Sequence, residues 1–498
     1  MSALDLPRSA GVLLHITSLP GPHGAGDLGA GARQFLTWLC RAGMRWWQVL
    51  PLVPPGGGWS PYSSWSAFAM NPWLMDLAGL VRDGLLDASE LAGPHTGGPI
   101  DWDAVVAFKG PRLERAACRL LDGARGDNRL RAELDLWRAD SAWVDDAALY
   151  SVLRARYGGP WWTWPTALRD RDPAALAAAA GDERVGLAIA VQFLVDRQWR
   201  QLKAEANARG VQLVGDMPIY VDAESADVWA NQALFQLNAD GSRPVVAGVP
   251  PDAFSETGQL WGNPLYRWDR MAADGFRWWI ARLRRALAQC DVVRIDHFRA
   301  FAAYWAVPGG DPDARGGAWV PGPGVAFFEA LSAELGPLPL VAEDLGLIDA
   351  PVRALLKAVG LPGMKVLQFA FGGGADNLYL PHNHVAKSVV YTGTHDNDTT
   401  RGYWSAAPEH VKDHVRRYFA TDGRDIAWTL TRAAMLSVAD LAIVPMQDVL
   451  DLGTEARMNT PSQPQGNWRW RLTEDGLREG QADRLRELVW LSGRGQNR

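Results

Sequence analysis

Two periodicities of apolar residues alternate along most of the chain. Apolar side chains recur at helical spacing in residues 32–39 and again in residues 187–202, where they form one continuous stripe. Between such segments lie short runs rich in Val, Ile and Leu, which are typical of strands buried on both faces. These runs span residues 11–16, 45–52, 211–221, 290–299, 338–346, 364–371, 387–399 and 441–450.

Strands that alternate with helices in this way predict a parallel α/β fold. We expect one catalytic (β/α)8 barrel, the TIM-barrel fold, over residues 1–498, with no C-terminal β-sandwich domain. Residues 76–186 are mostly helical in pattern and predict a helical insertion. Residues 222–275 predict a loop and hairpin insertion that covers the active site, with a hairpin turn in NADGSRP, residues 238–244.

An open, doubly wound sheet is the alternative fold. It is disfavoured because no G-x-G-x-x-G motif follows the first strand, and because charged residues end several strands. In a barrel, the carboxyl ends of the strands form the functional face.

Acidic residues end three of the predicted strands. Within CDVVRIDHFR, residues 290–299, Arg294 and Asp296 point the same way because side chains alternate along a strand. The guanidinium favours the ionised form of the carboxylate, although an ordinary buried Arg–Asp pair remains the alternative. Glu343 and Asp396 end two further strands, and barrel geometry brings all three acids to one mouth.

This set of acids fits cleavage of a glycosidic bond with retention of configuration. That reaction uses a carboxylate nucleophile and a carboxylic acid proton donor about 5–5.5 Å apart, and neighbouring strands are roughly 4.8 Å apart. Asp296 would be the ionised nucleophile. Glu343 has no adjacent cation in the sequence and precedes Asp344, so a raised pKa would let it donate a proton. Asp396 would orient the ring hydroxyls and stabilise the transition state.

Two histidines adjoin these acids. His297 and His395 are candidates to donate hydrogen bonds to sugar oxygens. A metal site built from the histidines and the acids is the rival interpretation. It is disfavoured because neither DHF nor HDND has a recognised metal-ligand spacing.

Two loops rich in Gly and Pro carry further candidates for sugar binding. Residues 54–73 follow the second strand and offer Tyr62, with Trp59 and Trp65 nearby, as flat faces for pyranose rings. The alternative is a packed aromatic loop. A second such loop, residues 248–264, bears Asp252, Gln259 and Trp261.

Composition narrows the class of partner. The chain has 25 tryptophans and a net charge of −6 without any basic block, which favours a sugar ligand over nucleic acid or an anionic membrane. Its three cysteines are far apart and lack metal-ligand spacing, which favours a cytoplasmic location. We see no signal peptide, and no apolar run approaches the roughly 18 residues of a membrane helix.

Several sequence blocks together resemble one enzyme family. VVRIDHFR, VAEDLG and TGTHDND are similar to the catalytic strand-end motifs of 4-α-glucanotransferases of the amylomaltase type, glycoside hydrolase family 77. The resemblance extends, in the order of the family, from about residue 11 to about residue 471. Its further blocks are GVLLHITSLPGPHGAGDLG, SPYSSWSAFAMNP, GDMPIYV, GVPPDAFSETGQLWGNPLY and GNWRWR.

The resemblance implies a role for each matching residue. Asp296 corresponds to the nucleophile, Glu343 to the general acid/base and Asp396 to the transition-state stabiliser. The other matching positions contact the nucleophile or the glucan: Arg294, Tyr62, Asp216, His395, Asp252, Gln259, Trp261 and Asn467.

The implied activity transfers a segment of an α-1,4-glucan to the 4-hydroxyl of another glucan or of glucose, with no metal or other cofactor. One alternative is a retaining hydrolase of the α-amylase type, which the absence of a C-terminal β domain disfavours. The other is a non-catalytic glucan-binding protein, which the three acids at strand ends disfavour.

Overall fold

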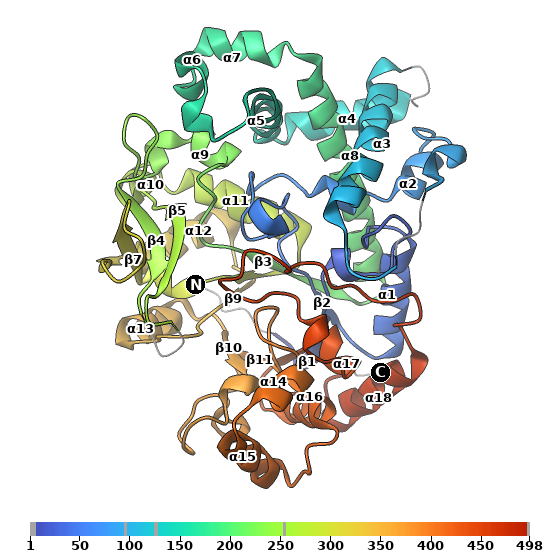
Figure 1. Cartoon of the computed structure of the whole chain (residues 1–498), viewed down its shortest axis with the longest axis vertical. Helices are drawn as coiled ribbons and strands as arrows, with labels where there is room; N and C mark the ends of the chain where they lie inside the picture. Colours follow the sequence, from blue (N-terminus) through green and yellow to red (C-terminus); the bar gives the residue numbers. More distant parts are fainter. Residues whose placement is uncertain (1–5, 94–96, 124–127, 252–254, 496–498) are drawn as a thin grey trace.

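Eight parallel strands form the centre of the computed structural model, which describes residues 6–93, 97–123, 128–251 and 255–495 (Figure 1). The strands are hydrogen-bonded in the order β10-β11-β12-β1-β2-β3-β6-β9. All eight predicted strands are present, which confirms the predicted TIM-like barrel. Their bounds are β1 Ser9–Leu13, β2 Trp46–Gln48, β3 Gln212–Met217, β6 Val292–Ile295, β9 Leu340–Ala342, β10 Gly363–Val366, β11 Ser388–Tyr391 and β12 Leu441–Pro445.

The barrel closes between β9 and β10 through only a few hydrogen bonds. The Ala342 N–H donates to the Pro362 carbonyl at 2.9 Å. One step further on, the Met364 N–H donates to Oδ1 of Asp344 at 2.6 Å, so a side chain stands where a strand carbonyl would. Glycine at position 363 leaves room for this contact, because a Cβ there would lie 2.4 Å from Oδ2 of Asp344 and would force the carboxylate to shift.

Alternate residues of each strand face opposite sides of the barrel wall, as expected from the period of two. One set, which includes Trp46, Val214, Val292 and Ile443, forms an apolar cluster inside the barrel. The other set packs against the surrounding helices in a larger cluster. Both faces of every strand are therefore covered, which explains why the strands appear in the sequence as short apolar runs.

Both helical stripes that the apolar periodicity predicts, at residues 32–39 and 187–202, lie in helices of the structure. The stripe at residues 187–202 belongs to α8, Glu183–Ala208, which begins after the N-cap Asp182. The remaining barrel helices are α1 Ala30–Arg41, α11 Arg277–Gln289, α12 Gly324–Leu335, α13 Ala350–Val359, α14 Thr400–Ala406, α15 Glu409–Phe419, α16 Ile426–Leu436, α17 Met446–Val449 and α18 Glu479–Leu491.

Helices also fill the first long segment between barrel strands. Figure 1 shows α5, α6 and α7 at the top of the molecule and α14, α15 and α16 at the bottom. Helices α3 and α5 pack against α8, which ties this segment to the barrel. The bounds in this segment are α2 Leu77–Arg82, α3 Trp102–Asp122, α4 Asn128–Ala139, α5 Val144–Tyr157, α6 Thr166–Arg169 and α7 Pro173–Ala180.

A second, antiparallel sheet of order β5-β4-β7-β8 lies beside the barrel, at the left of Figure 1. Its strands are β4 Val245–Val249, β5 Gln259–Pro264, β7 Ala303–Pro308 and β8 Ala318–Pro321, and the short helices α9 Ala226–Ala230 and α10 Trp268–Ala273 flank the first pair. Strands β7 and β8, which follow residue 299, were not predicted from the sequence. Both strands are rich in Ala and Pro, and β7 pairs with β4 across a long stretch of sequence.

The predicted hairpin turn at residues 238–244 exists, and the Asn238 N–H donates to the Ser242 carbonyl at 2.9 Å. It precedes β4, however, whereas the connection between β4 and β5 runs through residues 250–258. After Pro445 the described part of the chain contains helices and turns but no strand, in agreement with the predicted lack of a C-terminal β-sandwich. None of the described helices has both the length and the apolar character needed to span a membrane.

Candidate active site

Asp296 and Glu343 lie side by side at the carboxyl ends of the neighbouring strands β6 and β9. Each directly follows its strand, and the preceding residues Ile295 and Ala342 are paired in register between β6 and β9. The Glu343 N–H donates to the Ile295 carbonyl at 3.0 Å. Neighbouring strands are roughly 4.8 Å apart, which is compatible with the spacing of about 5–5.5 Å between the carboxyl groups of a retaining pair.

The Glu343 carboxyl group is buried and held by backbone donors. Oε2 accepts from the His297 N–H at 2.7 Å, and Oε1 accepts from the Leu345 N–H at 2.8 Å. Burial, followed by the negative charge of Asp296, raises the pKa of Glu343 to about 7. This carboxyl group is therefore partly protonated at neutral pH, as a general acid requires.

A buried arginine lies between two aspartates. The Arg294 guanidinium donates to Asp216 through Nη1 at 2.8 and 2.9 Å, and its Nη2 lies 2.9 Å from Oδ1 of Asp296. The guanidinium therefore orients Asp296 and neutralises charge in a place where water is largely absent. The Tyr62 hydroxyl donates to Oδ2 of Asp216 at 2.7 Å, which extends the network to the loop after β2.

The turn after β11 carries His395 and Asp396. The Tyr62 and His395 rings stack with centroids 4.8 Å apart and 12° between their planes. Asn459 Nδ2 donates to Oδ1 of Asp396 at 2.6 Å, and Nε2 of His395 lies 3.3 Å from the same oxygen. The carboxylate of Asp396 is thus held from one side.

His297 has an unusual backbone conformation for a residue with a side chain. Its φ of 54° is left-handed, which costs roughly 1–2 kcal/mol for such a residue. Its N–H is a donor to Glu343, and its ring meets Trp261 edge-on with centroids 4.7 Å apart. Burial lowers the pKa of His297 to about 4, so the ring is neutral at neutral pH.

A cavity of about 890 Å³ opens above these groups at the carboxyl ends of the strands. Its walls come from three segments rich in Gly, Pro and aromatic residues, which follow β2, include β5 and follow β12. The predicted site residues that line it are Tyr62, Gln259, Trp261, Asp296, His395, Asp396 and Asn467.

Other predicted site residues contact this set without lining the cavity. Asp216 reaches it through Tyr62, Arg294 through Asp296, and Glu343 through the His297 backbone. Asp252 lies outside the described residues. Among the residues with described positions, no group of three or more His, Cys, Asp or Glu side chains is arranged to hold a metal ion.

Asn467 shapes its loop with all of its amide groups. Its Oδ1 accepts from the Thr460 N–H at 2.9 Å, and its Nδ2 donates to the carbonyls of Thr460 and Gln463 at 3.2 and 2.8 Å. The side chain is therefore committed to closing residues 460–467 into one wall of the cavity.

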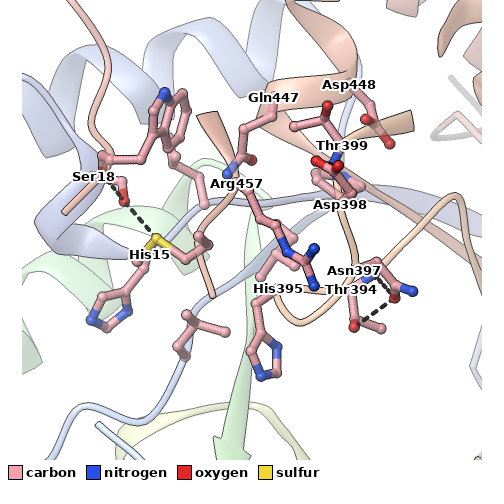
Figure 2. A pocket seen from close by; sticks show the side chains of 16 residues that line it. His15, Ser18, Thr394, His395, Asn397, Asp398, Thr399, Gln447, Asp448 and Arg457 are labelled. Carbon is pink, nitrogen blue, oxygen red and sulfur yellow. Dashed lines mark hydrogen bonds between the residues drawn. The ribbon is translucent and has the colours of Figure 1, made fainter. Parts of the chain in front are cut away.

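A second, much smaller cavity of about 30 Å³ lies behind the turn at residues 394–399 (Figure 2). This volume is enough for one or two water molecules. His15, Gln447, Asp448 and Arg457 are among the polar side chains around it. In Figure 2 the Arg457 guanidinium extends to the turn, where Nη2 donates to the Asp396 carbonyl at 2.6 Å.

Sequence reasoning did not single out Arg457 and Asn459. Both lie in RMNTP, more than 60 residues after Asp396, and neither directly follows a strand. The signal available was weak: a polar pair beside the GNW block that resembles the family. Only the fold shows that this segment contacts the turn after β11.

An acidic pair between neighbouring parallel strands, at a cavity walled by aromatic loops, defines a retaining glycoside-processing enzyme with a TIM-like barrel. The family model of glycoside hydrolase family 77, described as 4-alpha-glucanotransferase, matches residues 14–477. The chain belongs to this family.

Relatives and a solved structure agree with this assignment. The chain is 48% identical over 497 residues to the 4-alpha-glucanotransferase of Thermus thermophilus, with 98% of this chain and 99% of that protein covered. It is also 48% identical to a chloroplastic/amyloplastic 4-alpha-glucanotransferase of Arabidopsis thaliana, covering 98% of this chain and 86% of the relative. The amylomaltase from Streptococcus agalactiae in complex with acarbose superposes with a TM-score of 0.95 at 35% identity, covering 98% of this chain and all of that one.

Proposed function

We propose that this protein is a 4-α-glucanotransferase that moves a segment of an α-1,4-glucan to the 4-hydroxyl of an acceptor glucan or glucose. The single observation that carries the proposal is the Asp296–Glu343 pair. One acid is bound to an arginine, and the other is buried with a pKa of about 7. Two carboxyl groups whose environments differ in this way are suited to opposite roles in one reaction.

In the first step, Asp296 attacks the anomeric carbon of the donor glucan. The C1–O bond breaks, and Glu343 gives its proton to the departing 4-oxygen, so the leaving chain is released as a neutral alcohol. Asp296 is then joined to C1 as an ester, and Glu343 is left as a carboxylate.

In the second step, Glu343 takes the proton from the 4-hydroxyl of the acceptor. The acceptor oxygen attacks C1, and the ester bond to Asp296 breaks. Both acids return to their initial protonation states, and two inversions give overall retention. Asp396, on the turn after β11, would bind ring hydroxyls and stabilise positive charge as it develops.

The cavity supports transfer over hydrolysis. Transfer requires that an acceptor sugar, rather than water, meet the ester. Trp261 and Trp468 give the cavity aromatic walls that favour pyranose faces, so a bound acceptor sugar would displace water from them. The acarbose complex of the Streptococcus agalactiae amylomaltase supports a glucan-like ligand for this cavity.

We also infer a cytoplasmic location, because the three cysteines are all free thiols. Fractionation of cells that express the native gene tests this inference. Recovery of the protein outside the cytoplasm would contradict it.

Incubation of the protein with maltotriose tests the transferase proposal. Transfer predicts glucose together with maltodextrins longer than maltotriose, with no net gain of reducing ends. Accumulation of glucose and maltose alone, with a steady gain of reducing ends, would instead support the α-amylase-type hydrolase. Binding without turnover would support a glucan-binding protein.

A further inference from the structure

Asp396 is placed differently from the other two acids. Asp296 and Glu343 each directly follow a strand, whereas Asp396 lies five positions after Tyr391, the last residue of β11. Side chains on regular elements are held more firmly than side chains on loops. The orientation of the Asp396 carboxylate must therefore depend on contacts from elsewhere in the chain.

Those contacts come from the segment that follows β12. Arg457 Nη2 donates to the Asp396 carbonyl at 2.6 Å, and its Nε donates to the Asn459 carbonyl at 2.7 Å. The Asn459 N–H donates to the His395 carbonyl at 3.1 Å, and its Nδ2 donates to Oδ1 of Asp396 at 2.6 Å. Two side chains thus fix both the backbone and the carboxylate of one acid.

This arrangement distinguishes the two oxygens of Asp396. Oδ1 is bound by Asn459 and faces Nε2 of His395 at 3.3 Å. Within the described parts of the chain, Oδ2 accepts no hydrogen bond, and 46% of the side chain is exposed. One oxygen is therefore held by the protein while the other is presented to the cavity.

The same segment also forms a wall of the cavity. The Trp468 N–H donates to the Met458 carbonyl at 2.8 Å, between Arg457 and Asn459 in sequence. Asn467 closes residues 460–467 above this base. The loop that a glucan would touch and the contacts to Asp396 therefore share one frame.

We propose that Arg457 and Asn459 are positioning residues that set the carboxylate of Asp396 for the transition state. This inference rests on the proposed function, because it assigns Asp396 to stabilisation of developing charge. Asn459 lines the large cavity and Arg457 lines the small one, and the role proposed for each is exerted through Asp396. Their effect is to keep Oδ2 aimed at the ring before the substrate arrives, so that no reorganisation is needed at the moment of reaction.

The first test is Asn459→Ala. We expect kcat for maltotriose to fall about 10- to 100-fold, because a displacement of about 1 Å costs this much. The Kd of maltotriose, measured by calorimetry with the same substitution on an Asp296→Asn background, should change less than about threefold. If Asn459 had only a structural role, the substitution would lower Tm, but it would not lower kcat while leaving the Kd of maltotriose nearly unchanged.

Asn383→Ala is the matched control. Asn383 also fixes a loop through its amide, which donates to the carbonyls of Ala375 and Asn377 at 2.8 and 2.9 Å. It lines neither cavity described above. We expect its loss to leave kcat unchanged.

Asn459→Asp provides a readout within a single folded variant. At high pH the new carboxylate repels Asp396, whereas at low pH a shared proton restores the hydrogen bond to Oδ1. The ratio of variant to wild-type kcat should therefore rise as the pH falls from about 8 to about 5. The other charged or titratable groups described around Asp396 are His395, Arg457 and Tyr62. The variant and the wild-type protein share these groups, so their titration affects both kcat values in the ratio.

Arg457→Lys and Arg457→Ala test the second residue. An ammonium group cannot reproduce the fork that bonds two carbonyls, so we expect a partial loss of kcat for Lys and a larger loss for Ala. An unchanged kcat in Asn459→Ala, or a pH-independent ratio for Asn459→Asp, would overturn the inference. The proposed function would still hold in that case, provided that the wild-type protein converts maltotriose and Asp296→Asn does not. Absence of transfer by the wild-type protein would instead reject the proposed function.

Discussion

The Glu343 carboxyl group accepts a hydrogen bond of 2.7 Å from the N–H of His297, the residue directly after Asp296. The backbone that presents the proposed nucleophile therefore also holds the proposed acid. His297, whose N–H makes this contact, has a strained left-handed backbone conformation. The strain therefore lies at the residue that fixes the acid relative to the nucleophile.

Removal of either acid should abolish transfer. We expect Glu343→Gln to lower kcat about 10²- to 10⁴-fold and Asp296→Asn by roughly 10⁴-fold or more, because each takes part in bond breaking. Product formation from maltotriose measures both. Asp344→Asn is the matched control, since Asp344 adjoins Glu343 in sequence but binds the Met364 N–H. Full activity in Glu343→Gln would contradict the assignment.

The pH dependence of kcat/KM should show a basic limb near pH 7. The general acid must be protonated in the free enzyme, and the pKa of Glu343 is raised to about 7 by burial and by Asp296. Above that value, kcat/KM should fall by about tenfold per pH unit. Initial rates with maltotriose in a series of buffers measure it. A rate that stays constant to about pH 9 would mean that another group supplies the proton.

The carboxyl group of Asp344 at the barrel seam should make stability depend on pH. Burial raises its pKa from 3.8 to about 6 in the folded protein. Protonation therefore favours folding, and this contribution is present at low pH and lost as the pH rises through about 6. Relative to Asp344→Asn, wild-type protein should lose about 2–3 kcal/mol of unfolding free energy between about pH 4 and pH 7. Urea unfolding at several pH values measures it, and parallel pH profiles would contradict it.

Tyr62 should contribute through its ring and its hydroxyl separately. Tyr62→Phe keeps the stack on His395 but removes the donor to buried Asp216, and we expect a loss of about 1–3 kcal/mol in stability. Tyr62→Ala also removes the flat face, so KM for maltotriose should rise more than in Tyr62→Phe. Equal KM values in the two variants would exclude a stacking role.

The residues that the sequence revealed are those whose position follows from a strand. Each barrel strand is covered on both faces and so leaves a short apolar run, and Asp296 and Glu343 are found because they directly follow such runs. The strands end sooner than predicted, however. Strand β11 stops at Tyr391, so His395 and Asp396 lie on a turn rather than at a strand end.

The features that the sequence did not reveal depend on contacts between distant segments. Strand β7 is part of an antiparallel sheet through its pairing with β4, more than 50 positions earlier in the chain, and with β8. Asn459 contacts Asp396 across 63 positions of sequence. Neither the pairing of β7 nor the contact of Asn459 leaves a periodicity or a motif spacing in the sequence from which it could be predicted.

A trapped intermediate tests the central claim most directly. In Glu343→Gln, α-maltosyl fluoride can react without a proton donor because fluoride is a good leaving group, whereas release of the sugar lacks its general base. Peptide mass spectrometry should then find a maltosyl group attached to Asp296. A sugar attached to a different residue, or no adduct although the fluoride is consumed, would contradict the account.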